Sequence, residues 1–250
     1  MHHPRIDESL QGTLAWAKER LREKGYAVHS PVSLSVDPKL GIMGYARDEG
    51  EGHVIVISEW ALDSEMLGGL VLHELAHIYF TEKGAASHDR LVLDEVLSEM
   101  RTREGMRAKE VDCLAEVFNH LQNILVDDVV FDVLEGREQE TVRRFFSEWV
   151  SEKPTGDSVT DAALMCRNAF AVASLKRRNL FDDAADMRDK NDAFLSVFGE
   201  NAEADFEWIE GFLERANPEW SESEYRKAVV EYFETVLTLM RSSSKMHDLR

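Results

Sequence analysis

The sequence predicts an α+β fold that is mainly helical, with a small mixed or antiparallel sheet near the N-terminus. Two short runs between residues 28 and 58 have strand character, and apolar residues recur at helical spacing from residue 89 almost to the C-terminus. We expect a core at residues 1–152 and a helical C-terminal region at residues 153–250, divided at the turn Pro154-Thr155-Gly156. The C-terminal helices could equally complete one domain.

The N-terminal elements follow from periodicity and turn chemistry. A stripe of apolar residues at helical spacing predicts a first helix over residues 6–24. Alternating apolar and polar residues predict a strand within residues 28–36. The glycine-rich, charged segment 41–52 is expected to form a loop or hairpin, and the β-branched run His53–Ser58 to form the second strand.

The next helix is expected over residues 64–81, with Asp63 or Ser64 as its cap. Gly68 and Gly69 weaken its first turns, so we expect close packing at these glycines. Gly84 ends it. The remaining chain reads as helices over residues 89–105, 108–135, 138–152, 158–179, 182–197, 203–215 and 221–242.

Composition limits the classes of partner. The formal net charge of −19 comes from 48 acidic and 29 basic residues, so the surface should repel phosphate backbones and anionic membranes. We therefore expect no nucleic acid and no membrane partner, although the acidic helical C-terminal region could bind a basic protein. Two cysteines, no signal-like apolar stretch and no run of about 18 apolar residues favour a reducing, cytoplasmic setting.

The strongest functional signal is His73-Glu74-Leu75-Ala76-His77, which lies inside a strongly apolar helical segment. Residues four apart share one face of a helix, so both imidazoles can reach one metal ion, with Glu74 beside a metal-bound water. Burial of three ionisable groups is costly unless a metal or hydrogen bonds satisfy them. The alternative interpretation is a buried helix with hydrogen-bonded core histidines.

A third ligand must come from elsewhere in the chain. Phe80 and Lys83 stand where a metzincin needs glycine and histidine, which excludes that class. On a later predicted helix, the polar stripe Glu116, His120, Asn123 and Asp127 runs beside an apolar face. We expect Asp127 to be the third ligand of a Zn²⁺ ion, with Asn123 and His120 as candidates for orienting a ligand. Other candidates for the third ligand are Asp128, His120, Glu95 and Glu99.

Together, His73–Thr81 and Leu121–Asp128 resemble zincin metallopeptidases with a carboxylate third ligand, over about residues 50–135. The pattern is similar to metallopeptidase-like proteins whose second helix reads Asn-Ile-Leu-Glu-Asp, but Val126 stands here in place of the glutamate. The resemblance implies a zincin-like fold, one zinc ion and a glutamate base. It also implies an edge strand that binds an extended peptide, which we expect to be Val54–Ser58, unless that strand is interior.

The leading hypothesis is thus a zinc-dependent peptidase in which Glu74 activates a metal-bound water. His120 or Tyr79 could steady the oxyanion, although Tyr79 is expected to be a packing residue. One alternative is a non-catalytic binding or regulatory protein that keeps a metal site. Another is a zinc hydrolase acting on a non-peptide amide, which motif chemistry alone does not separate from a peptidase.

Overall fold

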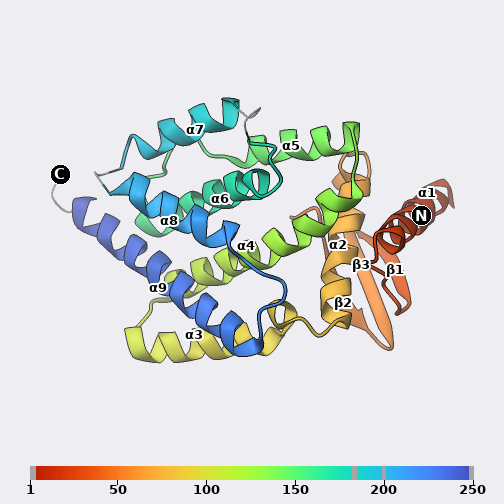
Figure 1. Cartoon of the computed structure of the whole chain (residues 1–250), viewed down its shortest axis with the longest axis horizontal. Helices are drawn as coiled ribbons and strands as arrows, with labels where there is room; N and C mark the ends of the chain where they lie inside the picture. Colours follow the sequence, from red (N-terminus) through yellow and green to blue (C-terminus); the bar gives the residue numbers. More distant parts are fainter. Residues whose placement is uncertain (1–3, 182–184, 199–200, 248–250) are drawn as a thin grey trace. The chain divides into compact units, whose positions relative to one another are not determined.

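The computed structural model describes residues 4–181, 185–198 and 201–247 (Figure 1). The chain folds as two compact units. The first unit comprises Met1–Ala85 and Val126–Val142, and the second comprises Ala86–Leu125 and Arg143–Arg250. These units do not coincide with the expected division at residue 152. The reason is that two helices, α4 (Ala108–Val133) and α5 (Arg137–Trp149), each contribute to both units.

The first unit is built on a mixed sheet whose described strands are β1 (Val32–Asp37), β2 (Gly44–Glu49) and β3 (Gly52–Ser58). The strand order is β1-β3-β2, with β1 parallel and β2 antiparallel to β3. Residues 41–52 were expected to form a loop or hairpin, and β2 does form a hairpin with β3. The expectation that Val54–Ser58 forms the edge of the sheet is wrong, because β3 has a hydrogen-bonded neighbour on each side and β2 is an edge.

Burial explains why β3 is the interior strand. Every residue from Val54 to Ser58 is buried, whereas β2 carries exposed side chains such as Arg47 and Asp48. A continuous β-branched run is suited to a strand with neighbours on both sides, and a charged strand is suited to an edge. The mixed pairing therefore follows the hydrophobicity of the strands.

In this unit α1 (Pro4–Glu23) packs against α2 (Leu67–Glu82), and α2 packs on β2 and β3. The expected cap is wrong, because α2 begins after Met66, which makes no side-chain capping bond. The Ser64 hydroxyl instead accepts a hydrogen bond from the Met66 amide at 3.1 Å. Gly84 has a φ of +66°, the left-handed conformation that ends the helix.

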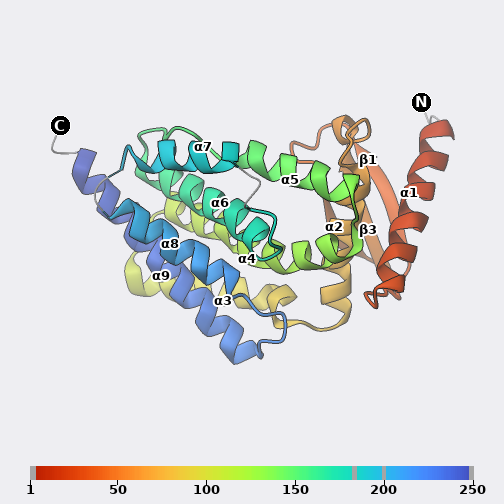
Figure 2. The ribbon, with the colours of Figure 1, turned by 45° about the horizontal axis from the view of Figure 1, so that its top comes forward.

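The second unit is helical over its described residues. It contains α3 (Arg90–Glu104), most of α4 and α5, α6 (Ser158–Lys176), α7 (Ala185–Leu195), α8 (Ala202–Glu214) and α9 (Glu222–His247). α6 packs against α8 and α9, which lie beside it (Figure 2). The helix expected over residues 182–197 is confirmed from Ala185, and residues 182–184 lie outside the described chain.

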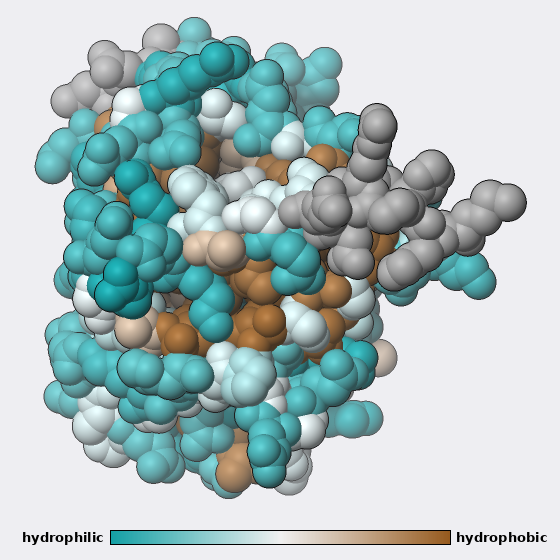
Figure 3. Space-filling model, turned by 90° about the vertical axis from the view of Figure 1, so that its right-hand side faces the viewer, coloured by the Kyte–Doolittle hydropathy of each residue, from teal (hydrophilic) through white to brown (hydrophobic). Residues whose placement is uncertain are grey.

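The fold is therefore α+β and mainly helical, as the sequence predicts. Two 3₁₀ turns, η1 (Glu59–Ala61) and η2 (Ala86–His88), complete the described elements. Among the described helices, none combines the length and apolar character needed to cross a membrane. On the face shown in Figure 3, hydrophilic side chains surround a group of apolar ones.

Candidate functional site

Helix α2 positions the motif residues on its faces as the spacing predicts. His73 and His77 are half-buried, and Glu74 is buried with 6% of its surface exposed. Their neighbours Leu72, Leu75, Ala76 and Ile78 are buried in the core, so they fix the helix in place. The two imidazoles remain partly accessible, and the carboxyl group between them lies deeper.

The imidazoles face each other across one turn of α2. His77 Nε2 lies 3.2 Å from His73 Nε2, with the ring planes inclined at 71°. Two nitrogens that bind one tetrahedral zinc at ordinary Zn–N lengths are separated by about 3.3 Å. The observed separation therefore fits two ligands of one zinc ion, and it also fits a hydrogen bond between the two rings.

Asp127, from the part of α4 in the first unit, contacts the other nitrogen of His73. Its Oδ1 lies 3.1 Å from His73 Nδ1. Because a carboxylate only accepts hydrogen bonds, this contact places the ring hydrogen of His73 on Nδ1 and leaves Nε2 as a lone pair directed at His77. The second carboxylate oxygen, Oδ2, is buried and has no hydrogen-bond partner among the described residues.

These contacts determine how the predicted ligands are arranged. The structure brings His73, His77 and Asp127 together, but Asp127 touches Nδ1 rather than the space between the two Nε2 atoms. Among the described residues, no three histidine, cysteine or acidic side chains converge on one possible metal position. The role of Asp127 as third ligand therefore stays a prediction, and its contact is that of a carboxylate behind a ligand histidine.

Glu74 is held by the edge strand. Its carboxylate accepts a hydrogen bond from the Ala46 amide of β2, and that bond and nearby His73 both favour the charged form. Burial outweighs both effects and raises the pKa of Glu74 above its ordinary value. A carboxyl group with a raised pKa is a better proton acceptor than an exposed glutamate, which suits a general base.

The position of β2 beside Glu74 was not predicted, because the sequence indicated only a loop or hairpin over residues 41–52. Ser58 N donates to Met43 O at 2.9 Å, so Met43 and Tyr45 belong to the hydrogen-bonded pairs with β3. Gly44, Ala46 and Asp48 therefore turn their backbone groups outward. The alternation of half-buried and exposed residues at the start of β2 is visible only in the structure. In the sequence the segment ends in three charged residues, Arg47, Asp48 and Glu49, which give no strand signal.

The other predicted site residues lie in different surroundings. Asp128 is half-buried next to Asp127, and Asn123 is half-buried in the second unit. Tyr79 packs edge-on against Tyr26 with ring centroids 5.4 Å apart, as expected of a packing residue. Two further candidates in the second unit form ion pairs with Arg226: Glu95 and Glu99.

His120 is a buried residue of the second unit. It stacks on Phe170 with ring centroids 5.1 Å apart, and its Nδ1 has no hydrogen-bond partner among the described residues. Burial, together with nearby Arg167, lowers the pKa of His120 to about 3. The imidazole is therefore neutral at pH 7 and serves the packing of this unit.

Comparison with known proteins assigns the chain to a family. No curated protein and no solved structure matches it. A family model described as a family of unknown function, DUF5781, matches residues 13–237. This range includes the whole of α2 and α4, and hence every residue of the candidate site. Because the match covers nearly all of the 250 residues, the chain belongs to the DUF5781 family.

Proposed function

We propose that this protein is a zinc-dependent peptidase of zincin-like architecture, acting in the cytoplasm. The observation that carries the proposal is the pair of Nε2 atoms 3.2 Å apart, backed by a carboxylate on the Nδ1 of His73. A buried glutamate lies next to His73 in the sequence. The two cysteines, Cys113 and Cys166, are free and buried, which suits a reducing compartment.

The residues present fit a zinc ion. His73 and His77 would hold it through Nε2, and the buried, unpartnered Oδ2 of Asp127 is a further oxygen donor close to His73. When bound, zinc supplies a Lewis acid and lowers the pKa of a coordinated water towards neutrality. The protein contributes the tautomer and direction of the first histidine, which Asp127 sets through the Nδ1 hydrogen bond.

Glu74 is the proposed general base. It would take a proton from the attacking water and pass it to the amine that leaves. Water thus adds a hydroxyl group to the carbonyl carbon, the C–N bond breaks, and the amine gains a hydrogen. Glu74 is oriented for this task by the Ala46 amide, which fixes the carboxylate between α2 and the edge strand.

The outward backbone groups of β2 are the proposed binding site for an extended peptide. Gly44 and Asp48 flank Ala46 along this edge, two residues to either side. A peptide strand paired with these groups would run beside α2, next to the carboxylate of Glu74. In strand addition the main-chain hydrogen bonds hold the peptide, and its side chains contribute little to them. This edge would therefore position the peptide without selecting its sequence.

A second candidate function is that of a non-catalytic binding protein that keeps a metal site. It is favoured by the lack of a third converging ligand among the described residues and by Val126, which stands where the similar pattern has a glutamate. Such a protein would bind zinc through His73 and His77 without hydrolysing peptides.

The test combines zinc binding with hydrolysis. We expect the purified chain to contain about one zinc per molecule by elemental analysis, and His73→Ala and His77→Ala to lose it. Glu74→Gln should keep zinc but lower peptide hydrolysis by about 100-fold or more, since general bases contribute on the order of 10²–10⁴. His29→Ala, which removes an exposed imidazole, is the matched control.

The outcomes separate the two functions. Zinc with no peptidase activity in the unaltered chain would support the binding protein. Equal hydrolysis by Glu74→Gln and the unaltered chain would reject the mechanism, and equal zinc content in His73→Ala would reject the metal site.

A further inference from the structure

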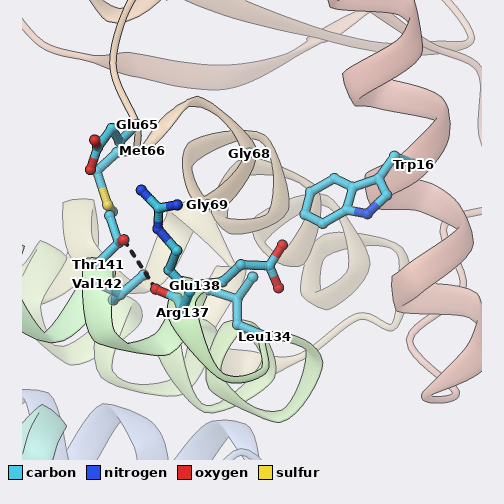
Figure 4. A pocket seen from close by; sticks show the side chains of 10 residues that line it. All are labelled: Trp16, Glu65, Met66, Gly68, Gly69, Leu134, Arg137, Glu138, Thr141 and Val142. Carbon is cyan, nitrogen blue, oxygen red and sulfur yellow. Dashed lines mark hydrogen bonds between the residues drawn. The ribbon is translucent and has the colours of Figure 1, made fainter.

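A cavity of about 300 Å³ lies in the first unit at the start of α2 (Figure 4). This volume is at the lower end of small-molecule sites. Its walls come from α1 through Trp16, from the first turn of α2 through Gly69, from the α4–α5 connection through Leu134, and from α5 through Arg137 and Val142. All of these residues belong to the same unit as the candidate metal site.

The cavity continues the helix faces that carry the metal-site residues. Gly69, His73 and His77 are four residues apart in turn, so they share one stripe of α2, and Gly69 lies about 6 Å along the helix axis from His73. Leu134 follows Asp127 by seven residues, which is about two helical turns. Along α2, the cavity lining therefore begins about 6 Å from His73, which is a little less than the length of two extended residues.

The packing of Trp16 shows why a glycine is needed here. A Cβ atom on Gly68 would lie 3.2 Å from the Trp16 ring, tighter than ordinary contacts. Gly68 thus lets the indole lie against the backbone of α2, as expected from the sequence. The same expectation is wrong for Gly69, because a Cβ atom there would meet its nearest neighbour at an ordinary 3.6 Å.

The charged side chains around the cavity differ in whether they have a partner of opposite charge. Glu138 is 4.0 Å from Arg20 and accepts a hydrogen bond from the Glu135 amide at 3.4 Å. The Glu65 carboxylate points away from the other lining side chains (Figure 4). The guanidinium of Arg137 extends towards the first turn of α2 (Figure 4), and it forms no hydrogen bond or ion pair within the described part of the chain.

We infer that this cavity binds the C-terminal residue of a peptide, so that the proposed peptidase removes residues from the carboxyl end. The terminal carboxylate would pair with Arg137, whose planar fork matches a carboxylate. An apolar side chain would lie on Trp16, Leu134 and Val142, since the last two are buried apolar residues. The net charge of −19 does not prevent this, because long-range fields are screened beyond about 8 Å at physiological ionic strength.

The inference rests on the proposed function, but its test does not require catalysis. The full-length chain with Glu74→Gln would be titrated calorimetrically with N-acetyl-L-phenylalanine and with the corresponding carboxamide. We expect the carboxylate to bind at least ~10-fold more tightly, as for a hydrogen-bonded charge pair. Adding Arg137→Gln should abolish this preference, whereas Arg101→Gln, which removes an exposed arginine of α3, should keep it.

A second measurement uses the unaltered chain with peptides that end in a free carboxylate or an amide. Faster hydrolysis of the free acid, lost in Arg137→Gln, is the expected result. Equal binding of acid and amide by the Glu74→Gln chain, or an unchanged preference in Arg137→Gln, would overturn the assignment of the cavity. Carboxylate binding without any hydrolysis would leave the cavity as a ligand site and reject the peptidase, so the two failures are distinguishable.

Discussion

At the scale of single residues, His73 and His120 have different hydrogen-bonding and packing surroundings. His73 donates from Nδ1 to Asp127, and its Nε2 faces His77. His120 stacks on Phe170, and its Nδ1 is unpartnered among the described residues. Burial without a compensating charge lowers the pKa of His120 to about 3, whereas a carboxylate behind His73 fixes its tautomer. The surroundings of His73 therefore suit the proposed zinc ligand, whereas those of His120 suit a packing residue.

Replacing His120 by leucine should reduce the loss of stability on acidification. In the unfolded chain the imidazole binds a proton below about pH 6.5, whereas in the folded chain it stays neutral down to about pH 3. The contribution of neutral His120 to the stability of the folded chain is therefore fully present above pH 6.5 and is lost as the pH falls. Between pH 7 and pH 5, the free energy of unfolding should fall by about 2 kcal/mol less in the variant. Urea titrations at both pH values measure this, with His29→Leu as the exposed control; an identical pH dependence would contradict it.

At the scale of elements, the contact of β2 with α2 builds the candidate site. A Cβ atom on Gly44 would lie 3.0 Å from the Val56 carbonyl oxygen and 3.4 Å from the Leu70 methyl carbons. Two residues later, the Ala46 amide donates to Glu74. The lack of a side chain at residue 44 therefore lets α2 approach the edge strand closely enough for Glu74 to reach its backbone.

Gly44→Ala should destabilise the protein by about 1–3 kcal/mol, the usual cost of overpacking. It should also weaken hydrolysis, since it pushes β2 away from Glu74. Gly41→Ala is the matched control, because a Cβ atom on Gly41 meets nothing within 4 Å. Thermal unfolding and peptide hydrolysis of both variants check this, and equal effects of the two substitutions would show that the close approach at Gly44 has no importance.

At the scale of the whole molecule, charge repulsion opposes local ion pairing. The net charge is −19, yet many acids are paired, as Glu95 and Glu99 are with Arg226. Exposed pairs contribute only about 0–1 kcal/mol each, and salt weakens them. The repulsion among the remaining acids acts over longer distances, and salt weakens it as well.

Adding NaCl from about 10 mM to about 150 mM should raise the midpoint of thermal unfolding by a few degrees. The Debye length falls from about 30 Å to about 8 Å over this range, so the long-range repulsion is lost before the contacts at ion-pair distance. Calorimetry at several salt concentrations measures the shift. A midpoint that falls with salt would mean that the ion pairs contribute more than the repulsion costs.

The sequence by itself determined the fold class, the helices and the one-face placement of His73 and His77. These features depend on spacing along the chain, and periodicity records spacing directly. Local patterns also gave the hairpin after residue 41 and the close packing at Gly68. The placement of Asp127 beside His73 followed from a polar stripe on a helix, although its role as third ligand stays a prediction.

Only the tertiary structure decided that β2 rather than β3 is the edge next to α2, that Asp127 takes Nδ1 of His73, and that His120 is packed against Phe170. Each of these features depends on tertiary contacts between residues that are far apart in the chain. Strand order is set by burial against neighbours, and the choice between two ring nitrogens is set by the direction from which another helix arrives. Neither the strand order nor the choice of ring nitrogen can be predicted from the periodicity of the sequence.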